Sequence, residues 1–356
     1  MRCFFLSGRA QYKKTCHTQQ CDTHNSGPLT EHTQSTLLII TDPVSIKISV
    51  FSLIRNSHNR YFRCIVNNSE GVHKEQGVGK QLTQQQIADY DQDGIVKLPG
   101  IIDDNILEKL NLCFDWSVAN PGPIAVGKPH GEHINFVDNG NPDAYQMYSD
   151  LVLESGFGHI AAELWDSEYV GFFAEEIFFK KGKSIPTYWH QDTVYSPWGG
   201  EHWANFWIPL VSMTAEQSIR IVRGSHKGIM YDGTTFNPAD PTEPLWGDAG
   251  NFPRLPDITS EHKANPTSWD IVGFDVSPGD IVVLHPHALH AGGKSDRDFQ
   301  VRRNLVLRFF GDKSHYSAHL PDAPGMYNHK PIPAIGGGFL ADGDPYRPVS
   351  MIQANV

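Results

Sequence analysis

From Tyr169 to Phe310 the chain reads as a series of short strands, and this pattern most constrains its fold. In segments such as 169–179 and 301–310, the side chains follow a period near two, as they do on the two faces of a strand. Gly, Pro and Asp mark the turns between these segments. Helical patterns precede them, between residues 83 and 164, with Thr83 and Gln86 placed as a capping box and Asp103 or Asp104 as the cap of a second helix. We therefore predict a mainly β fold with flanking helices, of the β-sandwich or jelly-roll type.

The first 80 residues differ in composition from the rest. They are rich in Thr, Gln, His, Ser and Asn and show no sustained period, so we expect a poorly structured N-terminal extension (1–80) with at most one isolated strand, at Ile46–Ile54. The folded domain is expected over 81–315. A Pro-, Gly- and Asp-rich insertion interrupts it at about 230–272, and a C-terminal tail, 316–356, is expected to pack on it.

Charge and cysteine content exclude several classes of function. Residues 1–80 hold ten basic and five acidic side chains, which leaves 19 basic and 35 acidic ones for the remainder. Such an acidic body argues against nucleic acid as a partner, because phosphate neutralisation needs a basic face. No run reaches the ~20 apolar residues of a membrane span. Cys113 is the only thiol of the body, which fits a reducing, cytoplasmic location. The sequence gives no signal for an oligomeric state.

A metal site is indicated by the stretch Thr187–Thr193, in which His190 and Asp192 stand two residues apart. On an extended strand, residues i and i+2 point to the same face, so the imidazole and the carboxylate would converge. They would supply two of the three ligands of the two-histidine-one-carboxylate triad, which holds Fe(II) and leaves the opposite side open.

The third ligand must come from a distant histidine that returns to the same point. His285, His287 and His290 are available, and we favour His290 because Pro286 between the first two breaks strand pairing. Arg302 and Arg303 follow at the start of the last strand. A guanidinium can grip the far carboxylate of an oxo-acid cosubstrate with two parallel hydrogen bonds, and alternation along the strand allows only one of the pair to face the pocket.

The order of these motifs resembles the phytanoyl-CoA dioxygenase family, which comprises non-haem Fe(II)- and 2-oxoglutarate-dependent oxygenases on a double-stranded β-helix (jelly roll, cupin-like). The resemblance runs from about Leu82 to Phe310. It is carried by Asp93-Gly94-Ile95-Val96, Trp189-His190-Gln191-Asp192, Trp207-Ile208-Pro209-Leu210, Gly224-Ser225-His226, Pro278-Gly279-Asp280, His290 and Arg302.

The resemblance implies three cofactors or cosubstrates: Fe(II), 2-oxoglutarate and O2. It implies that His190, Asp192 and His290 bind the metal, that Arg302 (with Arg303 as the alternative) pairs the C5 carboxylate of 2-oxoglutarate, and that Trp207 lines that pocket. The family's reaction releases succinate and CO2, and the carboxylate at position 192 favours hydroxylation of an aliphatic C–H bond over halogenation. Two other readings stay open: a cupin-like mononuclear metal enzyme that does not use 2-oxoglutarate, and a non-catalytic jelly-roll binding module.

The substrate is expected to be a small organic molecule whose identity the sequence does not give. Aromatic residues crowd the metal stretch, and two histidines lie in the preceding Gly-rich loop. For most of these side chains ordinary packing is the simpler interpretation, and the basic turn at 180–183 reads as a solvated face. The residues concerned are Tyr188, Trp189, Tyr195, Trp198, Trp203, His130 and His133.

Overall fold

The computed structural model describes residues 33–42, 45–56, 59–66, 81–182, 184, 186–293, 301–318 and 332–356. The chain divides into two compact units, Met1–Lys74 and Glu75–Val356, and each is described by itself.

The first unit contains one antiparallel sheet in the order β1-β2-β3, formed by β1 (Thr33–Asp42), β2 (Ser45–Asn56) and β3 (Asn59–Val66). The single strand predicted at Ile46–Ile54 lies within β2. The structure therefore has more regular backbone at 33–66 than the sequence analysis predicts for the leader. The three segments are rich in Ile, Val, Thr and Phe, which favour the pleated conformation.

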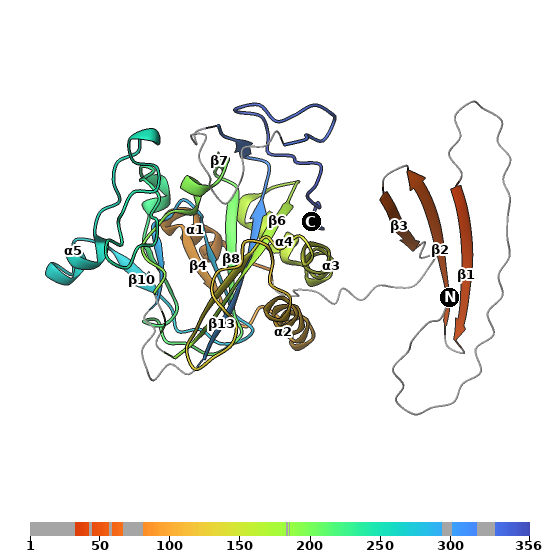
Figure 1. Cartoon of the computed structure of the whole chain (residues 1–356), viewed down its shortest axis with the longest axis horizontal. Coiled ribbons are helices and arrows are strands. Elements are labelled where there is room, and N and C mark those ends of the chain that lie inside the picture. Colours follow the sequence, from red (N-terminus) through yellow and green to blue (C-terminus); the bar gives the residue numbers. More distant parts are fainter. Residues whose placement is uncertain are drawn as a thin grey trace. The chain divides into compact units, whose positions relative to one another are not determined.

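A six-stranded antiparallel sheet forms the centre of the second unit, in the order β4-β11-β8-β13-β6-β5. Figure 1 labels four of its strands, β4, β8, β13 and β6. The strands are β4 (Ile95–Leu98), β5 (Ile134–Asn139), β6 (Gly171–Lys181), β8 (Trp203–Pro209), β11 (Ile281–Leu284) and β13 (Val301–Phe310). A smaller sheet has the order β10-β9-β12, and β14 pairs with β7. These strands are β7 (Trp198–Gly200), β9 (Ile219–Val222), β10 (Ile271–Gly273), β12 (His290–Gly292) and β14 (Ser314–Tyr316).

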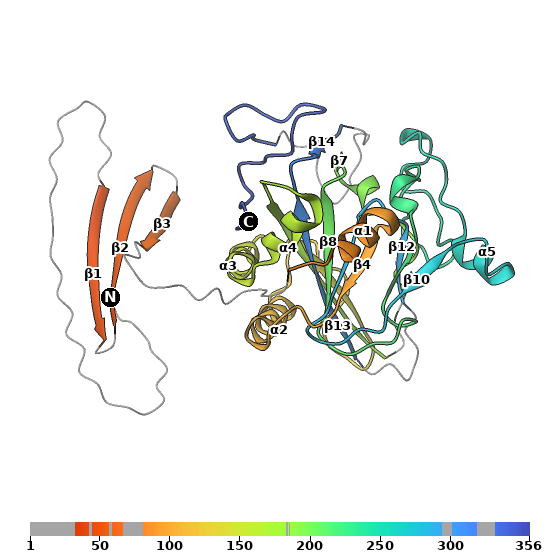
Figure 2. The same ribbon diagram turned by 180° about the vertical axis from the view of Figure 1, so that it is seen from behind.

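Helices cover one face of the large sheet. They are α1 (Gln84–Asp93), α2 (Asp104–Ala119), α3 (Tyr145–Ser155) and α4 (Phe157–Trp165), and α2, α3 and α4 gather on the same side of β13 and β6 (Figures 1 and 2). The predicted capping box is present, because Thr83 and Gln86 bond to each other's backbone amides at the start of α1. Asp103, one of two predicted caps, starts α2.

The two faces of the large sheet serve different purposes. Side chains on one face pack under the helices, including Phe206, Leu305 and Leu307. The alternate residues, such as Trp207 and Val306, face the small sheet and form a second cluster with Ile219 and Ile221. The structure is thus a double-stranded β-helix with an interior between its two sheets, and this interior holds the candidate site.

The insertion and the tail complete the second unit. The insertion carries the short helix α5 (Ile258–Ala264) and a 3-10 turn at Gly247–Ala249. At the C-terminus, the backbone of Ala354 donates to Val170 and that of Phe172 donates to Ile352, so the last residues lie along the start of β6. Among the residues described, no helix is long and apolar enough to cross a membrane.

Candidate metal centre and cosubstrate pocket

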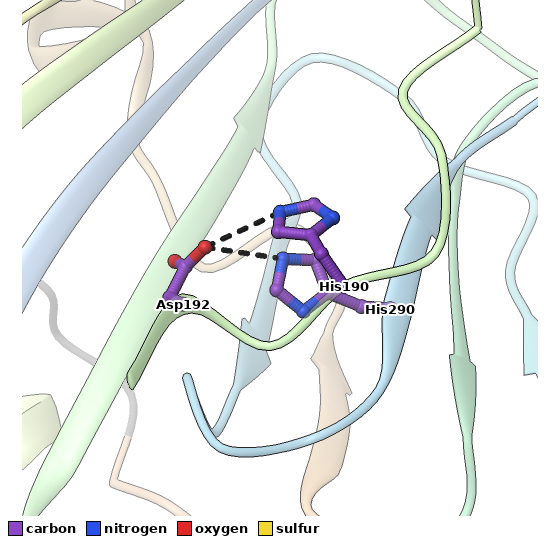
Figure 3. Close-up of side chains that lie close together, drawn as sticks. All are labelled: His190, Asp192 and His290. Carbon is purple, nitrogen blue, oxygen red and sulfur yellow. Dashed lines mark ion pairs between the residues drawn. The ribbon is translucent and has the colours of Figure 1, made fainter. Parts of the chain in front are cut away.

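His190 and His290 are joined directly through their backbones. Each amide donates to the other's carbonyl, with N···O distances of 3.0 and 2.9 Å, in an isolated antiparallel bridge. The two rings consequently lie side by side, with centroids 4.2 Å apart (Figure 3). His290 is the first residue of β12, as expected of the distal histidine.

Asp192 reaches the same point by a turn. The prediction that 190–192 forms an extended strand is wrong: Asp192 opens a 3-10 turn, Asp192–Tyr195, directly after the bridge at His190. The turn brings its Oδ1 to 3.3 Å from His190 Nε2 and 3.6 Å from His290 Nε2 (Figure 3). One ligand atom from each of the three residues lies within 4.8 Å of the others. Two imidazoles and one carboxylate in this arrangement fit a facial metal triad.

A hydrogen bond from Nδ1 to a backbone carbonyl fixes the orientation of each histidine ring. Nδ1 of His190 lies 2.7 Å from the carbonyl of Tyr188, and Nδ1 of His290 lies 2.8 Å from the carbonyl of Ala288. Because a carbonyl only accepts, each Nδ1 must carry the proton and donate it. Each Nε2 therefore keeps its lone pair for a metal, which is the usual arrangement of metal-binding histidines.

Electrostatics keep Asp192 and His290 in the protonation states that metal binding requires. Burial, followed by neighbouring His190, lowers the pKa of His290 to about 4, so its ring is neutral near pH 7. Burial acts to raise the pKa of the Asp192 carboxyl, but His290, the hydrogen bond with His190 and Arg308 together hold it well below its usual range. A neutral imidazole and an ionised carboxylate are the metal-binding forms.

Interior side chains of β6, β8 and β13 support the carboxylate. Asn205 Nδ2 donates to Asp192 Oδ2 at 2.7 Å, and Arg308 Nη2 lies 3.6 Å from the same oxygen. Arg308 also pairs with Glu176. The neighbouring Gln191 side chain donates to the carbonyls of residues 229 and 287 and accepts from the amide of residue 231. The sequence analysis missed Glu176, Asn205 and Arg308, because they lie on other strands than the stretch that carries the metal motif.

A second group of interior side chains surrounds Arg302. Its guanidinium is buried, lies over the Trp207 ring at 5.8 Å and donates to Asn304 Oδ1 at 3.2 Å. Within the described part of the chain, no carboxylate forms an ion pair with it, and burial lowers its pKa to about 10. Arg302 pairs across the ladder with Lys180 of β6, which is also buried. Burial, followed by Arg302, lowers the pKa of Lys180 to about 7.

Lys180 is therefore not part of a solvated charge run, contrary to the simpler interpretation of residues 180–183. Strand alternation puts Lys180 on the same face as Phe178, but only the pairing of β6 with β13 shows that this face is the interior. Arg303, the alternative to Arg302, lies on the opposite face of β13. Its guanidinium lies over Phe114 of α2 at 4.6 Å and pairs with Asp115 at 2.7 Å, on the helical side of the sheet.

The other candidates of the metal stretch have different environments. Trp198 and Trp203 stack on each other in the core, and Trp189 is buried with Arg220 over its ring. Tyr195 has its ring 6.2 Å from that of His190. His130 and His133, the two histidines of the Gly-rich loop, are exposed and lie before β5.

His285 and His287, the other distal-histidine candidates, are not triad members. They line a cavity of about 710 Å³ together with Thr193, Trp198 and His226. His287 Nδ1 lies 2.7 Å from Thr193 Oγ1, and its Nε2 lies 3.3 Å from the carbonyl of Gly228. None of the three triad residues lines this cavity, so it adjoins the metal centre without containing it.

Comparison with known structures supports the fold. SnoN, an epimerase solved with Fe3+, alpha ketoglutarate and nogalamycin RO, is 18% identical with a TM-score of 0.53, and the match covers 76% of this chain and 97% of SnoN. The carbocyclase SnoK of nogalamycin biosynthesis is 18% identical with a TM-score of 0.52, covering 77% and 97%. EctD from S. alaskensis with bound Fe is 16% identical with a TM-score of 0.52, covering 74% and 88%. At these identities the likeness shows a shared fold.

Sequence comparison identifies the family. No curated protein sequence matches the chain. The family profile described as phytanoyl-CoA dioxygenase (PhyH), however, matches residues 125–303, which include the triad and Arg302. Half of the chain is covered by this match, and its fold is that of the jelly-roll oxygenases. The chain therefore belongs to the phytanoyl-CoA dioxygenase (PhyH) family.

Proposed function

We propose that this protein is an Fe(II)- and 2-oxoglutarate-dependent dioxygenase that hydroxylates an aliphatic C–H bond of a small organic molecule. The observation that carries the proposal is the pairing of a metal triad with a buried guanidinium in one interior. When bound, iron and the oxo-acid supply oxidative decarboxylation by O2, which gives succinate and CO2 and is coupled to oxidation of the substrate.

The residues of this chain have separate roles in the proposal. His190, Asp192 and His290 hold the metal on one side and leave the other side free. Arg302 holds the far carboxylate of 2-oxoglutarate, with the Trp207 ring against it. A buried cation is costly, and among the described residues no carboxylate pairs with Arg302, so an anionic ligand would offset that cost.

Lys180 is a second cation for the same carboxylate in this proposal. It pairs with Arg302 across the ladder and shares its burial. Arg303 has no such role, because it pairs with Asp115 on the other side of the sheet.

The first experiment tests metal and cosubstrate together. Wild-type protein reconstituted anaerobically should bind one equivalent of Fe(II) and release succinate from 2-oxoglutarate when O2 is admitted, whereas Asp192→Ala should do neither. Metal binding without succinate release would favour the metal enzyme that does not use 2-oxoglutarate. No metal binding would favour the binding module.

The second experiment tests the cosubstrate pocket with matched variants. Arg302→Met should weaken 2-oxoglutarate binding by about 30-fold or more, which corresponds to ~2 kcal/mol for a lost charge pair, whereas Arg303→Met should not weaken it. Lys180→Met should also weaken binding, and Lys181→Met, which removes an exposed lysine next to it, should not. Equal affinities in the Arg302 and Arg303 variants would contradict the assignment.

The outcome of the oxidation needs its own measurement. SnoN and SnoK are described as an epimerase and a carbocyclase, so this fold also serves other oxidative reactions. The presence of a carboxylate at position 192 supports hydroxylation. Mass spectrometry of the product should show the gain of one oxygen atom, and the loss of two hydrogens or an unchanged mass would contradict hydroxylation.

A further inference from the structure

An aromatic side chain from the insertion lies against one of the triad histidines. The Phe236 ring meets the His190 ring edge-on, with centroids 5.4 Å apart at 72°. It also stacks on Tyr195 at 6.3 Å and 24°. Phe236 is 38% exposed, so part of its ring is covered by these neighbours and part remains open to solvent or a ligand.

The backbone of Phe236 is held in an unfavourable conformation. Its φ is +57°, in the left-handed region where glycine is the usual residue and a bulky side chain is an outlier. Asn251, in the same insertion, also has a positive φ of 52°, but asparagine tolerates this region. A strained phenylalanine beside a metal ligand indicates that its side chain is needed at that place.

The loop that carries Phe236 is anchored to residues just after Asp192. The amide of Thr234 donates to the Tyr195 hydroxyl at 2.7 Å, and the amide of Phe236 donates to Thr234 Oγ1 at 3.1 Å. Further along the insertion, Trp246 Nε1 donates to the carbonyl of Val194 at 3.2 Å. These bonds fix the position of the ring relative to the triad.

Apolar side chains gather beside Tyr195, on which this ring stacks. Val194, Tyr195 and Trp246 form a cluster with Met230, Leu245 and Phe252. The carboxylate of Asp232 is engaged by the backbone amides of residues 246 and 247. The charged groups beside Asp192, Glu176 and Arg308, pair with each other. What the insertion presents next to His190 is therefore hydrocarbon surface.

We propose that Phe236 is a specificity-determining residue whose ring, together with Tyr195, contacts the part of the substrate that is oxidised. It follows that the aliphatic C–H bond that is oxidised belongs to an uncharged hydrocarbon part of the substrate. The inference rests on the proposed function, since it assumes that a metal occupies the triad.

A paramagnetic metal and a small apolar probe test this inference without knowledge of the substrate. The protein is loaded with Mn(II) and 2-oxoglutarate, and Mn(II) occupancy is measured by electron paramagnetic resonance. Fluorine NMR of added 4-fluorotoluene then measures line broadening, which requires the probe to come close to the metal. The wild type should broaden the signal, and Phe236→Ala and Phe236→Gly should each reduce the broadening about fivefold. Phe236→Leu, which keeps apolar bulk, should retain most of it.

The comparison of alanine with glycine separates contact from a structural role. Glycine relieves the positive φ and alanine does not, so Phe236→Gly should be the more heat-stable of the two. If the ring acts by contact, both lose broadening equally despite their different stability. Broadening that follows stability, with glycine retaining it and alanine losing it, would overturn the inference. Asn251→Gly, at another position of positive φ in the insertion, should behave as wild type.

The remaining outcomes separate the inference about Phe236 from the proposed function. If Mn(II) binds to the wild type but the probe is not broadened, the inference about Phe236 is overturned and the proposed function stands. If neither Mn(II) nor Fe(II) binds, the proposed function is refuted and the inference with it. Unchanged broadening in both the alanine and the glycine variant would show that the ring makes no contact with the probe.

Discussion

Asp280, in the Pro278-Gly279-Asp280 turn before β11, offers a test of how the large sheet is held together. Its side chain is only 10% exposed. Oδ1 accepts from the amide of Gly100 at 2.8 Å, Oδ2 accepts from the amide of Ser277 at 3.0 Å, and Lys97 Nζ lies 3.0 Å from Oδ2. One carboxylate thus joins the turn before β11 to the end of β4. We consider Asp280→Ala and Asp280→Asn.

The size of the effect follows from the hydrogen bonds that the carboxylate accepts. Alanine removes two of them, and a hydrogen bond to a charged group contributes roughly 1.5–3 kcal/mol, with the lower end applying here because Gly100 and Ser277 are exposed. The pair with Lys97, whose side chain is 26% exposed, adds about 0.5 kcal/mol. We therefore expect Asp280→Ala to lower the free energy of unfolding by about 3 kcal/mol. Asparagine keeps one acceptor oxygen, so Asp280→Asn should cost about 2 kcal/mol.

Urea unfolding followed by tryptophan fluorescence measures these differences. All eight tryptophans lie beyond residue 115, so the signal reports the second unit. The slope of free energy against urea should be unchanged, since the same surface unfolds. Lys97→Met is the control for the ion pair and should cost about 0.5 kcal/mol. A loss below about 1 kcal/mol in Asp280→Ala, or wild-type stability in Asp280→Asn, would refute this account of the turn.

Three further predictions concern the metal, the alternative arginine and pH. Anaerobic Fe(II) at 100 times its Kd should stabilise the wild type by about 2.7 kcal/mol, measured as a higher Tm, and should leave Asp192→Ala unchanged. Arg303→Ala should lower the free energy of unfolding by about 1 kcal/mol, through loss of the contacts with Asp115 and Phe114, and should not alter 2-oxoglutarate affinity by calorimetry. Burial lowers the pKa of His285 from 6.5 to about 3, so the unfolded chain takes up a proton first and stability falls as pH drops through this window. In urea titrations between pH 6.5 and 3, the free energy of unfolding of His285→Gln should depend less on pH than that of the wild type. An equal dependence on pH in the two proteins would contradict the role given to His285.

Local signals predicted several elements with their ends. The capping box at Thr83 is set by residues three apart, and it is present. The last strand, predicted at Val301–Phe310, has these bounds because period-two alternation extends over its whole length. The sequence also allowed only one of two neighbouring arginines to face the interior, and alternation places Arg302 there and Arg303 under α2.

Contacts between distant segments could not be predicted in the same way. Lys180 reads as part of a charge run, and only its pairing with Arg302 on another strand places it inside. Phe236 lies in an insertion without a period, and its position against His190 depends on hydrogen bonds to Tyr195. The strand expected through Asp192 is a turn, because the chain leaves the bridge at His190 immediately afterwards.

The backbone bridge between His190 and His290 has a consequence for how this centre can change. The spacing of the two imidazoles is set by peptide groups, which every amino acid possesses, and does not depend on the side chains themselves. Exchanging either histidine for another donor would leave the scaffold intact and alter only the chemistry presented to the ion. The metal preference of the centre can therefore change through these two side chains while the fold stays the same.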